Sequence, residues 1–183
     1  MSTETVSLHV NEIPSLNLGD NPTDCCPQFQ PEWWDDQLFQ MRDKKFVRAT
    51  TIGILHIPIN IGSVFTRTFK KIEDAGAVDR NKAIVLSRDL SAWKAEHLFS
   101  VTDDVPGQTM VSISGDFRSK VFEGPFSNAG KWCQELGEIA GIENAGEPNF
   151  FYYTTCPKCA KVYGKNYVVG FAPTGKISIE LTS

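Results

Sequence analysis

Two proline-marked junctions, each joining a strand-like apolar run to an amphipathic helix, constrain the fold of this chain more than any other feature. The first is centred on Pro58 and the second on Pro125, so they lie 67 residues apart. The same offset relates further apolar positions, namely Phe65 to Trp132 and Ile72 to Ile139. A period of this length predicts a duplicated module, because solenoid repeats usually run to only about 20–50 residues.

Each module reads as strand, helix, strand and strand. In the first, β-branched and apolar residues predict a strand over 46–57, and apolar spacing predicts a helix from Ile61 to Gly76. The remaining segments are two strands over 83–86 and 95–101, then a strand over 110–123, a helix from Pro125, and strands over 149–155, 166–172 and 176–181. This order predicts an α+β fold in which two pseudo-repeated modules, about 44–103 and 108–175, form antiparallel sheet with helices on one face.

The first 43 residues form a separate expectation. Four prolines among polar residues predict a partly extended arm over 1–43, ahead of a domain over 44–183. Trp33-Trp34 and Leu38-Phe39 are the apolar residues that would pack this arm onto the domain. The arm therefore needs a partner surface on the body of the protein.

Composition narrows the class of protein. The chain has 183 residues, 41% of them hydrophobic and 22% charged, which is typical of one soluble globular domain. A net charge of −4 without a long basic run argues against a nucleic-acid partner. No apolar run reaches the roughly 20 residues of a membrane span, and no signal peptide is visible. Five cysteines without a secretion signal favour a cytoplasmic location; the oligomeric state is not predicted.

Several motifs carry a family resemblance. Ser114–Phe117, followed by Val121–Phe126 and Trp132, resembles the turn into the second helix of the GyrI-like small-molecule-binding domain, whose fold is shared with the SOUL haem-binding proteins. The resemblance covers about residues 44–172. The chain is more closely similar to a group of stand-alone bacterial proteins labelled "hydrolase", through Cys25–Pro27, His56–Pro58 and Thr154–Lys161. The resemblance implies small-molecule binding, because GyrI-like relatives include drug-binding sensors and hydrolases of reactive natural products.

Glu123 and His56 are the catalytic candidates. Glu123 ends a strand just before Gly124-Pro125, where a carboxylate could point into a cleft between the modules. Burial among aromatic side chains would raise its pKa and suit it to general acid or base work; capping of the second helix is an equal alternative. The repeat offset relates His56 to Glu123, so a pseudo-two-fold axis would bring the two side chains together.

Aromatic residues are the candidates for binding a substrate. Trp93 precedes the third strand of the first module, in which Glu96 and His97 lie, and Tyr153 and Tyr167 lie in the second module. Aromatic walls suit a flat or cationic organic ligand. Strand alternation lets either Tyr152 or Tyr153 face the cleft, but not both. Asn166 would hydrogen-bond a ligand or shape its loop.

The thiols allow three interpretations. Cys156 and Cys159 form a Cys-x-x-Cys pair, and Cys25 and Cys26 could complete four ligands for a structural zinc that fastens the arm. A thiol-redox motif is the second interpretation, and a loop without a ligand is the third. Cys133, on the apolar face of the second helix, is expected to be a buried structural thiol.

The sequence thus favours a protein that binds a small, aromatic or cationic organic molecule in the cleft between the modules, with hydrolysis of that molecule as its enzymatic version. Glu123 and His56 would act on a ligand that Trp93, Tyr153, Tyr167 and Asn166 hold. The alternative is a zinc-stabilised or thiol-redox protein built on the four cysteines. No cofactor is required; structural zinc is the candidate.

Overall fold

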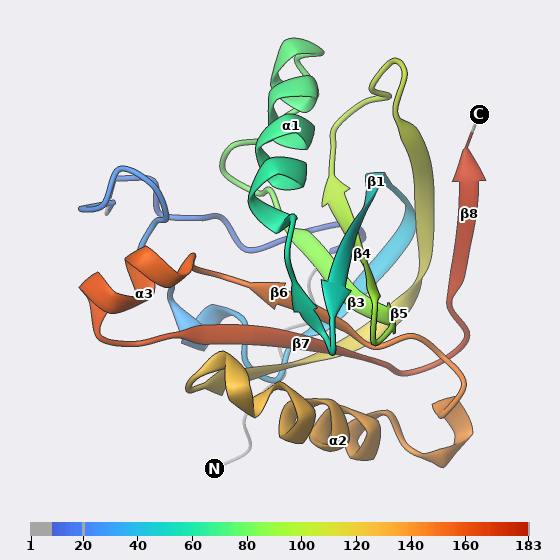
Figure 1. The fold of residues 1–183 in the computed structure, drawn as a ribbon. Helices are drawn as coiled ribbons and strands as arrows, with labels where there is room; N and C mark the ends of the chain where they lie inside the picture. The colour runs from blue at the N-terminus through green and yellow to red at the C-terminus, as the bar shows by residue number, and fades with distance from the viewer. Residues whose placement is uncertain (1–8, 20, 183) are drawn as a thin grey trace.

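A computed structural model describes residues 9–19 and 21–182 and contains an eight-stranded antiparallel sheet (Figure 1). The strands are β1 (Leu38–Ile54), β2 (Ile57–Pro58), β3 (Val85–Ser91), β4 (Lys94–Ser100), β5 (Thr109–Glu123), β6 (Phe150–Tyr153), β7 (Tyr167–Pro173) and β8 (Ser178–Thr182). The α-helices are α1 (Ile61–Asp74), α2 (Ala129–Ala140) and α3 (Pro157–Tyr163). Short 3-10 turns cover Pro31–Trp33, Phe126–Asn128 and Ile142–Asn144.

The sheet closes into a barrel because the long strands β1 and β5 pair with each other. The hydrogen-bonded order β1-β4-β3-β6-β7-β5 returns to β1 through this pairing, which runs from Leu38 opposite Arg118 to Arg48 opposite Thr109. A bulge between Met41 and Lys44 bends β1 within it. β2 is a short hairpin partner of β1, and β8 pairs with the first half of β5.

Alternation along the strands separates an inner face from an outer face. Phe46, Leu98 and Phe171 belong to the largest apolar cluster, and their chain neighbours Val47, Phe99 and Ala172 belong to two other clusters. Ile72 of α1 lies in the cluster of Val47 and Phe99, whereas Trp132 and Leu136 of α2 lie in the cluster of Ala172. Both long helices therefore cover the outer face, and the β1–β2 hairpin projects between them (Figure 1).

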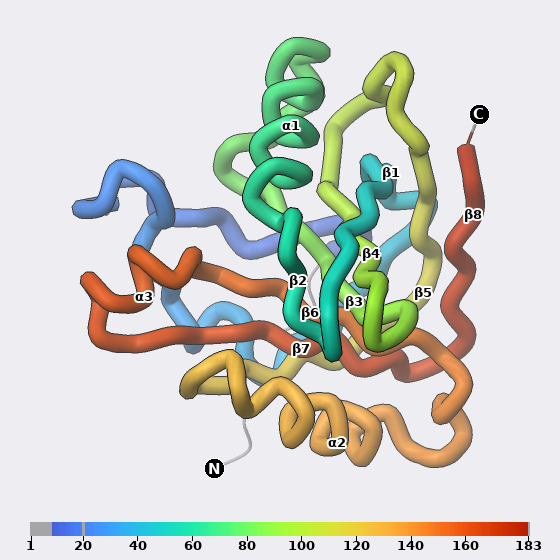
Figure 2. Tube along the Cα trace, in the orientation of Figure 1, coloured from blue at the N-terminus to red at the C-terminus, as the bar shows by residue number. Residues whose placement is uncertain are grey.

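The arm supplies part of the inner core. Ile13, Phe29 and Trp34 are buried in the cluster that also contains Phe39 and Tyr152. The ring of Trp34 lies 5.9 Å from that of Phe39 and 5.4 Å from that of Tyr152. Figure 2 shows the arm running beside α3 before it enters β1. The apolar side chains of the arm are thus part of the barrel core. Of the predicted anchor Trp33-Trp34, Trp34 is buried there and Trp33 is half exposed.

The predicted strands and the two long helices occur in the predicted order. α1 forms because Val64, Thr68 and Ile72 recur at helical spacing and bury one face against the sheet. The helix ends before Gly76, whose φ is +66°. The Cys-Pro-Lys-Cys run, by contrast, was expected to be a loop and forms α3. The internal repeat as such stays a prediction. No helix in the described part of the chain is long and apolar enough to cross a membrane.

Candidate functional site between α1 and α2

His56 occupies a strained two-residue turn at the tip of the β1–β2 hairpin. Leu55 and His56 have φ angles of +49° and +68°, values that side-chain-bearing residues adopt at a cost of about 1–2 kcal/mol each. The amide of His56 donates to the carbonyl of Ala92 at 2.9 Å, and the amide of Gly53 donates to that of Trp93 at 2.9 Å. The β3–β4 hairpin, which carries Trp93, therefore holds this turn in place.

Asp89 lies at the centre of the residues gathered on this face. Its Oδ2 is 2.6 Å from Nδ1 of His56. Burial lowers the pKa of His97 to about 4, and the charge of Asp89 acts against this shift. Partial burial raises the pKa of Tyr153 to about 12 and raises the pKa of the Cys133 thiol, and the charge of Asp89 adds to both shifts. Asp89 thus contacts His56 directly and lies close enough to His97, Tyr153 and Cys133 for its charge to influence the pKa values of those three groups.

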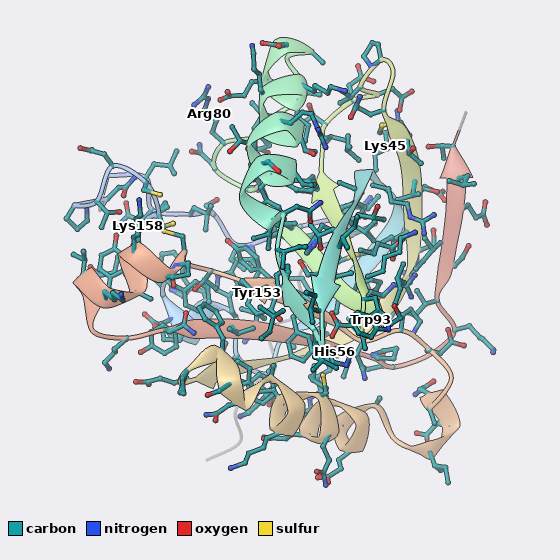
Figure 3. All side chains as sticks on the ribbon, viewed as in Figure 1. Lys45, His56, Arg80, Trp93, Tyr153 and Lys158 are labelled. Atoms are coloured by element: carbon teal, nitrogen blue, oxygen red, sulfur yellow. The ribbon has the colours of Figure 1, made fainter. Side chains whose placement is uncertain are left out.

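Aromatic side chains surround this carboxylate. Figure 3 shows His56, Trp93 and Tyr153 in the region between α1 and α2. The ring of Tyr153 lies 5.7 Å from that of Phe126, which precedes α2, and both rings are partly exposed. Trp93 is 57% exposed. Such a surface offers π-faces and one negative charge to a ligand.

Cys133 does not match its prediction as a buried thiol. The side chain is exposed on α2, because Trp132 and Leu136 occupy the positions that face the sheet. Its neighbour in the sequence, Trp132, stacks on Phe122 at 5.6 Å and so takes the core position. Cys133 therefore faces the region around Asp89 and Tyr153.

Glu123 and Tyr167 lie on the other face of the sheet. Phe122 packs against Trp132 of α2, so alternation turns the next residue, Glu123, away from the helices. Tyr167 pairs with Glu123 across β5 and β7, and its ring lies 5.7 Å from Phe29 of the arm. Within the described residues, His56 pairs with Asp89 and not with Glu123. Tyr167 and Tyr153 consequently do not share one surface.

Asn166 shapes the chain after α3. Its Nδ2 donates to the carbonyl of Gly124 at 2.8 Å, and its Oδ1 accepts from Thr155 Oγ1 at 3.1 Å. Both ends of the amide are thereby engaged within the protein. This geometry agrees with the alternative in which Asn166 organises its loop.

The four cysteines Cys25, Cys26, Cys156 and Cys159 meet in space. Their Sγ atoms all lie within 4.8 Å of one another. The separations are 3.7 Å for Cys25–Cys26, 4.0 Å for Cys25–Cys156 and 3.4 Å for Cys156–Cys159. A zinc ion with Zn–S bonds of about 2.3 Å has S–S edges of about 3.8 Å, so these four sulfurs lie close enough together to hold one metal ion.

Neighbouring groups hold the thiols in this arrangement. Thr23 Oγ1 accepts from the amide of Cys26 at 3.2 Å and lies 3.3 Å from Cys159 Sγ. The hydrogen bond to Thr23 lowers the pKa of Cys159 to about 7, whereas burial raises the pKa of Cys26. Tyr163 of α3 donates to the carbonyl of Cys26. The arm and α3 therefore form one cluster, in which the vicinal pair and the Cys-x-x-Cys pair each contribute two sulfurs.

His56, Trp93 and Tyr153 were named as candidates from the sequence, whereas Asp89 was not. The strand expected over 83–86 stops short of Asp89, whereas β3 runs from Val85 to Ser91 and places Asp89 two residues after Ser87 on the same face. The contact of Asp89 with His56 of the β1–β2 hairpin depends on how the barrel closes, and the sequence does not show it.

Comparison with known proteins identifies one family. A family model described as "Bacterial hydrolase" matches residues 16–174, which include the cysteine cluster, both hairpins and both long helices. No curated protein and no solved structure matches the chain. The match supports the resemblance to hydrolase-labelled bacterial proteins, whereas the relation to GyrI-like domains stays a prediction.

Proposed function

The chain belongs to the bacterial hydrolase family, and we propose that it binds and hydrolyses a small aromatic or cationic organic molecule between α1 and α2. The observation that carries this proposal is the 2.6 Å contact of Asp89 with His56 beside exposed aromatic rings. A family name alone does not define a reaction, whereas these side chains can perform one.

The pair supplies a general base. An ionised carboxylate only accepts hydrogen bonds, so Asp89 keeps the proton of His56 on Nδ1 and leaves Nε2 free. Nε2 can then take a proton from water or return one to a leaving group. The strained turn at His56 supports this role, because strained backbone concentrates at functional sites.

The test is hydrolysis of 4-nitrophenyl acetate, a neutral aromatic ester, by wild type and by Asp89→Asn. We expect kcat/KM to fall at least about 10²-fold in the variant. Asp36→Asn is the matched control: both carboxylates are half exposed and contact one basic side chain, but Asp36 pairs with Arg118, and its variant should keep full activity. Equal rates for wild type and Asp89→Asn, or no hydrolysis by wild type, would overturn the proposal.

A second proposal concerns the cysteines: they hold a structural zinc ion that fastens the arm to α3. The spacing of the four sulfurs supports it, as does the ordering that metal binding would give an arm with little secondary structure. The site has four protein ligands and leaves no open position, which is typical of structural zinc. Metal analysis of protein purified without added zinc should find about one ion per chain.

Cys159→Ser should lose this ion, and Cys133→Ser should keep it, because Cys133 lies outside the cluster. A metal-free wild type, or equal zinc in both variants, would contradict the site. Zinc loss without loss of ester hydrolysis would show that the metal is structural. A disulfide between cluster thiols in freshly purified protein would favour the redox alternative.

Other expectations stay predictions of the sequence. They are the relation to GyrI-like domains, the duplicated module, the cytoplasmic location and the catalytic role of Glu123. Glu123→Gln in the same ester assay tests the last of these. A large loss of activity there would place the chemistry on the inner face of the sheet.

A further inference from the structure

A chain of three buried polar side chains crosses the outer face beneath α1. Ser87 Oγ lies 2.8 Å from Nδ1 of His97, and Nε2 of His97 lies 2.9 Å from Oγ1 of Thr51. The three residues stand on neighbouring strands β3, β4 and β1, and they are 6%, 4% and 1% exposed. Ser87 is two residues from Asp89 on the same face of β3, so this chain adjoins the proposed site.

The surroundings of this chain are apolar. The ring of Phe65 from α1 lies 5.0 Å from the imidazole of His97, in an edge-on arrangement, and also contacts Phe99. Apolar residues at these three positions would pack the helix onto the sheet without burying polar groups. A satisfied polar chain inside an apolar layer departs from the pattern that packing alone favours, and such departures are expected at functional sites.

The hydrogen bonds suit His97 to act as a base toward Ser87. Burial lowers the pKa of His97 to about 4, so its ring is neutral near pH 7 and has one free lone pair. When Nε2 donates its proton to Thr51, Nδ1 accepts from the hydroxyl of Ser87. The set then has a nucleophile, a base and a group that orients the base, which is the arrangement of nucleophilic catalysis.

We propose that Ser87 is a covalent nucleophile and that the substrates are uncharged or cationic carboxylic esters; this inference rests on the proposed hydrolase function. Ser87 Oγ attacks the carbonyl carbon while its proton passes to Nδ1 of His97. The C–O bond to the leaving group breaks, and the alcohol departs with that proton. Water then attacks the acyl-serine ester, releases the carboxylic acid and restores the proton to Ser87.

The charge of this face selects the substrate class. Asp89 is the one carboxylate among the positions of β1, β3 and β4 that share this face near the polar chain, and it lies two residues from Ser87 on the same strand. The cations Arg67 and Lys71 stand on α1, in a hollow that Ala49 and Thr50 also line. An anionic substrate at Ser87 would therefore meet the charge of Asp89 on the same strand, so neutral and cationic esters are favoured.

Phe65 packs against the proposed base. Its ring contacts the imidazole of His97 edge-on, so we expect it to restrict access to the serine that is hydrogen-bonded to this imidazole. Phe65→Ala removes this cover and leaves the three hydrogen-bonding side chains in place. The variant therefore separates access to the serine from the chemistry at the serine.

The test is labelling with diisopropyl fluorophosphate, which forms a Ser Oγ–P bond and releases fluoride. Wild type should gain one adduct that peptide mapping places on Ser87, and Phe65→Ala should gain it faster. Ser87→Ala and His97→Gln should lose the adduct, and Ser87→Ala should lower kcat/KM for 4-nitrophenyl acetate at least about 10³-fold. Ser112→Ala, which changes another buried serine of the sheet, should match wild type.

The outcomes separate this inference from the proposed function. Unlabelled Ser87 in wild type and in Phe65→Ala, with ester hydrolysis that still depends on Asp89, would overturn the nucleophile and leave the hydrolase proposal standing. Labelling of Ser87 without ester hydrolysis would support the nucleophile and contradict the proposed reaction of the wild type. The wild-type mapping decides the question even if Ser87→Ala does not fold.

Discussion

The buried imidazole of His97 should make the stability of this protein depend on pH in a defined window. Burial lowers the pKa of His97 from 6.5 in the unfolded chain to about 4, while the charges of Asp89 and Glu96 act in the opposite direction. Between these two values the unfolded chain binds more protons than the folded one, so stability falls as the pH falls. The contribution is fully present above about pH 6.5 and is lost by about pH 4.

The magnitude follows from the two pKa values. Each unit of difference corresponds to about 1.4 kcal/mol, so the full loss is about 3 kcal/mol, of which about 2 kcal/mol falls between pH 7 and pH 5. Urea unfolding monitored by tryptophan fluorescence measures it. Wild type is compared with His97→Gln, which has no imidazole at this position to titrate. Both proteins are measured with a chelator present, so that pH-dependent zinc binding by the cysteines does not contribute.

We expect wild type to lose about 2 kcal/mol more than His97→Gln over that interval. Ser112→Ala is the control, because it changes another buried polar residue of the sheet that has no proton to exchange in this range, so the pH dependence of wild type should remain. Equal losses in wild type and His97→Gln would refute the reasoning. The imidazole would then keep a pKa near 6.5 in the folded state, and burial would not be what holds it neutral beside Ser87.

Three further predictions test the fold by chemical unfolding. Leu55→Gly should raise the free energy of unfolding by about 1 kcal/mol, because glycine adopts a positive φ without strain; a loss of stability would contradict the strained turn. Trp34→Ala should cost about 3–5 kcal/mol and the half-exposed Trp33→Ala less than about 1 kcal/mol, since Trp34 is 1% exposed; equal costs would remove the arm from the core. Gly170→Ala should cost about 1–3 kcal/mol, because its Cβ would lie 2.5 Å from a leucine of α2, whereas Gly137→Ala meets no atom within 4 Å and should not destabilise.

Local elements were predictable where apolar residues recur with the period of one structure. α1 was expected from Ile61 to Gly76 and spans Ile61–Asp74, because its buried face repeats every four residues. α3 was missed because Pro157–Tyr163 buries Cys159 alone and has no apolar period. Its helical turn coincides with the thiol cluster, and that cluster includes two residues far away in the sequence.

Contacts between elements far apart in the sequence were harder to predict. The 67-residue offset paired His56 with Glu123, but alternation places Glu123 on the inner face, and the actual partner of His56 is Asp89. The meeting of Cys25 and Cys26 with Cys156 and Cys159 was one of three interpretations. The sequence shows which side chains can act as acids, bases or metal ligands. It does not show which of them lie in contact, because that depends on how the sheet closes into a barrel.

The pairing of β1 with β5 also sets the order in which this chain can fold. It joins segments about 70 residues apart and completes the ring, so the loop-closure entropy must be overcome before the inner core is sealed. Local hairpins such as β3–β4 can form early, but Trp34 finds its full set of neighbours only once the ring is shut. While the chain is being synthesised and β5 has not yet left the ribosome, the apolar inner face of β1 is therefore exposed to solvent. We expect the protein to be most prone to aggregation during this interval.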